Sequence, residues 1–182
     1  MKAMKTKMLI FVFLLGITDL FAQTLYVPGA IVKGKNASYY CAFENKLVVR
    51  VYNVNNVDTT TTMYYDDGTV VPFDEGSAVI ETKNEDLVRV FQEALTQEEI
   101  DILKSKITCS LQLDIVTDKQ GNTLEITFRF RTYDPVMTKF DPDRLYQLEQ
   151  NLKKVLKLNP SKADSSIKNM KYFLPISYKD LK

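Results

Sequence analysis

The amino-acid sequence predicts an α+β protein, in which an antiparallel sheet packs against helices that are segregated from it. Residues 108–117 and 123–132 each alternate apolar and polar side chains, as strands with one buried face do. Apolar residues then recur at helical spacing between 145 and 156. The last apolar run, residues 172–178, is rich in strand-forming residues. These three features predict a hairpin, a helix and a closing strand.

The hairpin has the most regular pattern in the chain. Its apolar side chains are Cys109, Leu111, Leu113 and Ile115 in the first strand, and Leu124, Ile126, Phe128 and Phe130 in the second. A slip of one residue would place a whole apolar face in water, so the pattern specifies the register. Gly121, in the connection between the strands, supplies the positive φ that a short hairpin loop needs.

The helix and the closing strand follow from their terminal residues. Asp141 can cap a helix, and Pro142 suits its first turn because the missing N–H would have no partner there. Asn159-Pro160 ends the helix. Pro175 cannot donate to a strand ladder, so the closing strand is expected at a sheet edge or with an irregular end.

The same segment carries motifs in the order found in the C-terminal domain of TonB-type energy transducers. They are Asp118-Lys119-Gln120-Gly121 at the turn, Phe140-Asp141 at the helix start, Leu158-Asn159-Pro160 at its end and Leu174-Pro175-Ile176-Ser177-Tyr178 in the closing strand. Residues 108–178 therefore resemble that family. The resemblance implies an α-β-β-α-β arrangement whose open sheet edge can receive a strand from a partner. It makes Lys171, Tyr172, Phe173, Ser177 and Tyr178 candidate partner-binding residues.

The first half of the chain reads as strands followed by helices. Strands are predicted at residues 39–43, 47–54 and 77–81, and a type I′ hairpin around Asp67-Gly68. Asn84 is the expected cap of a helix that runs to about Leu95. Thr96 and Glu99 form a capping box for a second helix that runs to about residue 107.

Residues 1–22 have the features of a cleaved signal peptide. Three lysines precede an apolar run over residues 8–17, and Ala22 precedes the expected cleavage site. The remainder, residues 23–182, is expected to form one compact domain with a β-rich half (23–95) and a TonB-like half (96–182). The mature protein should then be exported, to the periplasm or outside the cell, without a transmembrane segment. It also lacks the Pro-rich arm of true transducers, so energy transduction is not expected.

Composition argues against several functional classes. The formal net charge of +1 gives no electrostatic reason to expect nucleic acid as a partner. The chain has no histidine, which removes histidine-dependent triads and most zinc ligand sets, so no cofactor or metal is expected. The two cysteines, Cys41 and Cys109, are as consistent with one buried disulfide as with two buried thiols.

Other polar groups have a structural interpretation beside a functional one. Asp66-Asp67-Gly68 and Asp118–Asn122 contain possible calcium ligands, but turns favour the same residues, and Asp141-Pro142-Asp143 reads better as a helix cap. Ser165-Ser166 lies in a polar loop. Tyr39-Tyr40 and Tyr64-Tyr65 should each place one ring near the surface. Arg129 and Arg131 share a wet face with Glu125 and Asp114, which favours cross-strand salt links.

Three functional hypotheses follow. The first is a non-catalytic binding or scaffold protein of the periplasm or cell envelope, which recognises a protein or envelope component by strand addition. The second is a carrier that holds a lipid or another hydrophobic ligand between its hairpins. The third is a small hydrolase, which would require a cluster of carboxylates that the linear sequence does not reveal.

Overall fold

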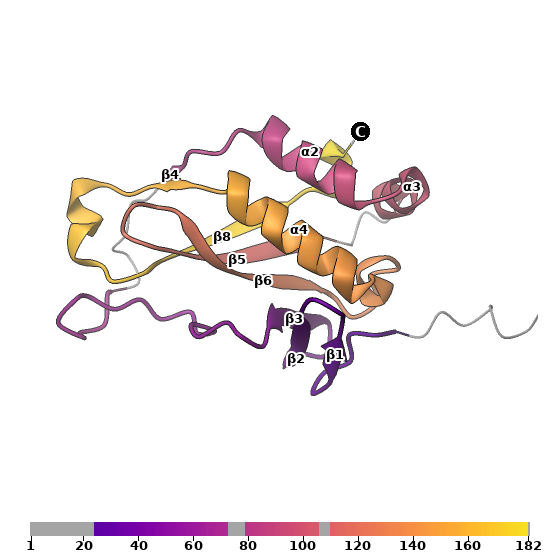
Figure 1. Cartoon of the computed structure of the whole chain (residues 1–182), viewed down its shortest axis with the longest axis horizontal. Helices are drawn as coiled ribbons and strands as arrows, with labels where there is room; N and C mark the ends of the chain where they lie inside the picture. Colours follow the sequence, from indigo (N-terminus) through magenta and orange to yellow (C-terminus); the bar gives the residue numbers. More distant parts are fainter. Residues whose placement is uncertain (1–23, 73–78, 106–109, 182) are drawn as a thin grey trace, which may run out of the picture.

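A computed structural model describes residues 24–72, 79–105 and 110–181. One six-stranded antiparallel sheet organises the molecule (Figure 1). Its spatial order is β1 (Ile31–Lys33), β2 (Ser38–Asn45), β3 (Val48–Asn53), β6 (Thr123–Arg131), β5 (Leu111–Thr117) and β8 (Met170–Ile176). A small ladder joins β4 (Val79–Ile80) to β7 (Leu158–Asn159). The α+β class with an antiparallel sheet is confirmed, and the pairing of β3 with β6 joins strands from both halves of the chain.

Helices α2 (Asn84–Ala94) and α4 (Pro142–Val155) lie over one face of the sheet, with α3 (Gln97–Ser105) beyond them (Figure 1). Three short 3₁₀ helices, Met137–Lys139, Lys162–Ser166 and Tyr178–Asp180, complete the regular structure of the described residues. The core lies between sheet and helices, where the strand side chains meet the apolar stripes of α2 and α4. Its largest members include Tyr39, Phe91, Phe128, Phe130, Phe140, Leu111 and Leu113.

The central hairpin follows the predicted pattern closely. Leu113, Ile115 and Phe128 are buried on the helix-covered face, whereas Leu124 is 46% exposed near the turn. Gly121 has φ +79°, and a side chain there would place Cβ only 1.9 Å from the Leu158 carbonyl oxygen. Glycine is therefore required twice at this position, for its backbone conformation and for the close approach of the chain that follows α4.

Two of the three predicted helix caps are correct. The Asp141 carboxylate accepts hydrogen bonds from the backbone N–H groups of Asp143 and Arg144, at 3.0 Å each. Thr96 and Glu99 exchange the two bonds of a capping box. The expected cap at Asn84 is wrong. Helix α2 begins one residue earlier, so Lys83 is the cap residue and makes no side-chain capping bond.

The hairpin at Asp67-Gly68 is present, but its predicted type I′ turn is wrong. Gly68 has φ +85°, and no residue other than glycine has a positive φ in the described chain. Type I′ needs two such residues. The Tyr65 N–H instead donates to the Thr69 carbonyl, which encloses a three-residue loop.

Two buried carboxylates fasten the outer elements to the sheet. Glu149 of α4 is fully buried, accepts a 2.7 Å hydrogen bond from the Tyr39 hydroxyl and lies 2.6 Å from Lys153 Nζ. Burial beside this carboxylate raises the pKa of the Tyr39 hydroxyl. Asp134 accepts hydrogen bonds from the N–H groups of Val136 and Met137 and from the Tyr178 hydroxyl. Tyr178 lies two residues after the end of β8, so Asp134 anchors the chain that leaves that strand.

We expect the Asp134 anchor to depend on its hydrogen bonds more than on its charge. Burial raises the pKa of the Asp134 carboxyl above 3.8, although the bonds from Met137, Val136 and Tyr178 oppose the shift. The folded state therefore binds the proton more tightly than the unfolded state. The free energy of unfolding should fall as the pH rises from about 3.8 to the folded-state pKa, and then become constant.

Urea unfolding of two variants between pH 3 and pH 7 tests this anchor. Asp134→Ala leaves buried donors unpaired and should lose roughly 2 kcal/mol or more, because each such group costs about 1–3 kcal/mol. Asp134→Asn keeps the acceptor oxygen, so it should lose less and should remove the local pH dependence. Equal losses in both variants would show that the hydrogen bonds do not carry the effect.

Candidate functional site: the edge strand and the strap beside it

Strand β8 is the edge of the sheet, as Pro175 predicted. It pairs with β5 on one side only, with Gln112 opposite Pro175 and Asp114 opposite Phe173. The other edge, β1, is three residues long, whereas β8 has seven. Long edges expose more unpaired backbone than short ones, so β8 is the more competent edge for pairing.

The register decides which backbone groups of β8 remain free. Opposite residues in an antiparallel sheet alternate between hydrogen-bonded and non-hydrogen-bonded pairs. The Thr132 N–H donates to the Leu47 carbonyl, which sets this alternation for β3 and β6. The same alternation can be followed from β6 through β5 to β8. It directs the Leu174 N–H towards β5, and it directs the N–H and C=O of Phe173 away from β5.

The outer edge of β8 therefore carries the N–H and C=O groups of Lys171 and Phe173 and the C=O of Pro175. Pro175 has the same outward orientation, so its missing N–H costs no bond to β5. Within the described residues, no backbone or side-chain group bonds to these outward atoms. They form a short, ready-made template for another strand.

A groove runs between the end of β8 and α2. It has a volume of about 80 Å³. Its apolar lining comes from α2, from the end of β8 and from the C-terminal segment, and consists of Leu87, Val88, Phe91, Leu174, Pro175, Ile176 and Leu181. A chain that paired with β8 would place alternate side chains on this side of the sheet.

The opposite face of the sheet is polar. Asp114 on β5 lies 2.7 Å from Arg129 Nε and 3.9 Å from Arg50 Nε, and Arg129 also lies 3.3 Å from Glu44. The cross-strand link of Arg129 with Asp114 is as predicted. Burial raises the pKa of the Asp114 carboxyl, while the Gln112 hydrogen bond and the two arginines oppose the shift. The Arg129 guanidinium also lies 5.9 Å from the Phe173 ring centre.

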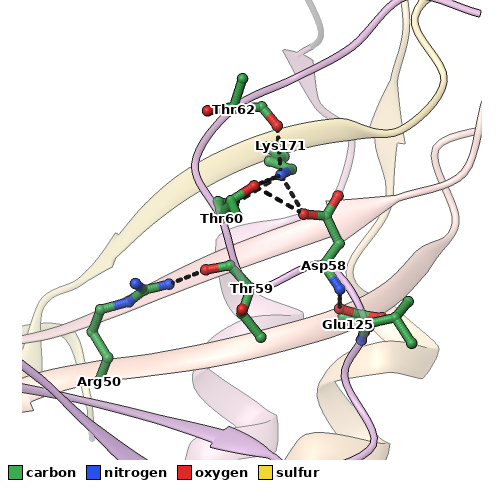
Figure 2. A network of polar contacts seen from close by, with 8 residues as sticks. Arg50, Asp58, Thr59, Thr60, Thr62, Glu125 and Lys171 are labelled. Carbon is green, nitrogen blue, oxygen red and sulfur yellow. Dashed lines mark hydrogen bonds and ion pairs between the residues drawn. The ribbon is translucent and has the colours of Figure 1, made fainter. Parts of the chain in front are cut away.

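An irregular segment, residues 54–62, crosses this polar face and is called the strap below (Figures 1 and 2). Side chains of the sheet bind its backbone. Arg50 Nη2 donates to the Thr59 carbonyl at 2.7 Å, and the Glu125 carboxylate accepts from the N–H groups of Val57 at 2.8 Å and Asp58 at 3.0 Å. Charged side chains of the sheet thus bind the backbone of the strap, whereas the backbone of a strand is bound by that of the neighbouring strand.

Lys171 of β8 makes more contacts with the strap than Arg50 or Glu125 does. Its Nζ lies 2.5 Å from Asp58 Oδ1, 2.8 Å and 3.1 Å from the carbonyl and hydroxyl oxygens of Thr60, and 2.7 Å from the Thr62 carbonyl (Figure 2). Only 5% of the Lys171 side chain is exposed. The ammonium group of Lys171 therefore points into the strap and not towards the free edge of β8.

The structure separates the five candidate partner-binding residues. Phe173 and Ser177 are exposed and Tyr172 is half-buried, whereas the Lys171 side chain is held by the strap and Tyr178 is buried on Asp134. The groove residues of α2 were missed as site residues. Helical periodicity marks Leu87 and Phe91 as inward-facing, but no local signal shows that β8 lies beside them.

The acidic turn residues occupy structural positions. Asp67 accepts bonds from the Thr69 N–H and hydroxyl, which lower the pKa of its carboxyl. Burial raises the pKa of Asp118, but hydrogen bonds from Asn122, Gln120 and Gly121 outweigh it and lower the pKa overall. Asp66 pairs with Lys119 at 2.5 Å, and Asp143 accepts from the Lys35 N–H at 2.7 Å.

The tyrosine pairs divide between faces as predicted. Tyr39 is buried, whereas Tyr40 contacts Tyr52 on the open face, and Tyr64 is 42% exposed. Cys41 is a buried free thiol, and burial raises its pKa to about 11. Cys109 lies outside the described residues. Ser165 and Ser166 fall in the 3₁₀ helix after β7 and are exposed. No helix of the described chain is long and apolar enough to cross a bilayer.

Proline substitutions test the assignment of inward and outward groups on β8. Leu174→Pro removes a donor to β5 and should lower the free energy of unfolding by roughly 2 kcal/mol more than Leu174→Ala. Phe173→Pro removes only an outward donor, so it should match Phe173→Ala within about 0.5 kcal/mol. Chemical denaturation of the four variants measures both differences, and the reverse ranking would refute the assignment.

Comparisons with known proteins place the fold. No protein-family model matches the chain, and the search of curated proteins gave no significant match. The structure is similar to the crystal structure of a DUF5043 family protein from Bacteroides uniformis, with a TM-score of 0.70 and 18% sequence identity. The similarity covers 85% of this chain and 88% of that chain. It shows a shared fold, and the resemblance to the TonB family finds no support in these comparisons.

Proposed function

We propose that this is an exported, non-catalytic binding protein of the bacterial periplasm or cell envelope, which adds an extended segment of a partner protein to β8. The observation that carries the proposal is the outer edge of β8, where the N–H and C=O of Lys171 and Phe173 have no partner among the described residues and the α2 groove lies beside the end of the strand. Main-chain hydrogen bonds give affinity in this recognition mode, and pockets for alternate side chains give specificity.

The devices that usually protect a sheet edge are weak on β8. Natural edges are blunted by short strands, prolines and lysines. Strand β8 is seven residues long. Pro175 has no backbone N–H, so it removes one outward donor, near the C-terminal end of the strand. Its lysine, Lys171, is paired with Asp58 in the strap and does not guard the edge. An edge left open in this way is consistent with selection for pairing.

The surroundings of β8 specify the chemistry of the added segment. On the helix side, it would meet the apolar groove formed with Leu87, Val88 and Phe91. On the other side, it would lie beside Phe173, which is 44% exposed. The partner segment should therefore be extended, with aliphatic side chains at the alternate positions that face α2.

The motifs of residues 108–178 add support by resemblance, since the open sheet edge in TonB-type domains also receives a partner strand. The features of residues 1–22 support export, which would place the free edge among envelope or secreted proteins.

Site-specific photocross-linking in cells that make the protein tests this function. A photoreactive residue at Phe173 or at Val88 should capture the same partner protein, because these positions flank the free edge and its groove. The matched control is Lys154, which is exposed on the outer side of α4. Capture that is equal from all three positions would contradict recognition at β8.

A second variant separates backbone pairing from side-chain contact. With the cross-linker at Val88, Phe173→Ala removes the ring but keeps the outward N–H. Phe173→Pro removes both. If strand addition holds the partner, the proline variant should lose most of the capture that the alanine variant retains. Equal capture by the two variants would mean that the main chain of β8 does not bind the partner.

A further inference from the structure

The strap has the character of a segment that opens easily. Its described contacts with the sheet are polar, while Val57 is 91% exposed and Val54 is 45% exposed. Segments with few buried apolar contacts open locally at low free energy. The strap therefore gains its position from a few charged side chains of the sheet.

The surface under the strap is mainly polar. A hollow of about 10 Å³, enough for about one water molecule, separates strap and sheet. Arg50, Asp114, Thr127 and Lys171 contribute to its lining, together with the apolar Val116. Opening of the strap would hydrate these polar groups and would expose some apolar surface at Val116, which is buried but lies outside the main core cluster.

Lys171 connects this segment to the edge strand. Its ammonium group is surrounded by four strap oxygens, one of which belongs to the Asp58 carboxylate. Loss of that carboxylate would leave the lysine charged and without its counter-ion. The freed charge would then lie on the same strand whose outward N–H and C=O groups are open for pairing, and an edge lysine discourages pairing.

We propose that the strap is a latch that controls strand addition: when closed, it holds the charge of Lys171 away from the β8 edge, and when open, it releases that charge and blocks the edge. The control of strand addition rests on the proposed function. The closure of the strap by Lys171 and Asp58 does not.

Hydrogen exchange of the full mature chain tests the closure first. Asp58→Asn and Lys171→Met should each raise exchange in residues 54–62 by about tenfold or more, since a charge-assisted hydrogen bond contributes about 1.5–3 kcal/mol. Exchange in α4 and β6 should stay unchanged. Lys119→Met is the matched control, because it removes another Lys–Asp pair at 2.5 Å, one that is largely exposed. Strap exchange that does not rise, or rises only with global unfolding, overturns the latch.

Cross-linking from Val88 then tests the control of the edge. Asp58→Asn opens the strap and frees a charged Lys171, so capture of the partner should fall several-fold. Lys171→Met opens the strap without leaving a charge, so capture should persist, and the double variant should recover it. Equal loss in both single variants would overturn the role of the lysine charge.

Two further results keep the conclusions separate. If Asp58→Asn does not fold, Glu125→Ala loosens the strap from β6 and leaves Lys171 intact, and it should also lower capture. If the unmodified protein captures no partner from β8, the proposed function fails and the control of the edge fails with it. The exchange measurements still decide whether Lys171 closes the strap.

Discussion

The ladder between β5 and β8 is the interaction on which the candidate site depends. Because β8 pairs on one side only, the alternation of antiparallel bonds leaves the backbone of Lys171 and Phe173 facing outward. The Tyr178 hydroxyl, bound to the buried Asp134, holds the chain that follows the strand. The free edge is thus a consequence of register, and it is supported by a buried anchor at its end.

One-sided burial explains the rest of the architecture. Helices α2 and α4 cover a single face of the sheet, so the apolar side chains of β3, β5 and β6 gather there. Within the described residues no helix covers the other face, so its polar side chains find partners on neighbouring strands and on the strap. Asp114 and Arg129 do so across the strands, while Arg50, Glu125 and Lys171 bind the strap. Placing α2 next to β8 also creates the groove beside the free edge.

The solved structure of the DUF5043 family protein shares this fold at 18% identity. Core positions tolerate such divergence because any apolar residue of suitable volume can fill them. The strap depends on particular charges, among them Asp58 and Lys171, which general apolar character cannot replace. A shared fold therefore does not by itself imply that the contacts of the strap are shared.

The sequence by itself determined the local elements. Alternation in residues 123–131 specified a strand, Asp141-Pro142 the start of α4, and Pro175 an edge position, because each depends on neighbours within a few residues. Tertiary structure alone decided that β3 pairs with β6, that α2 lies beside β8 and that Lys171 binds the strap. Lys171 and Thr60 are 111 residues apart, and no periodicity encodes a contact over that separation. Only the packed sheet brings these groups together.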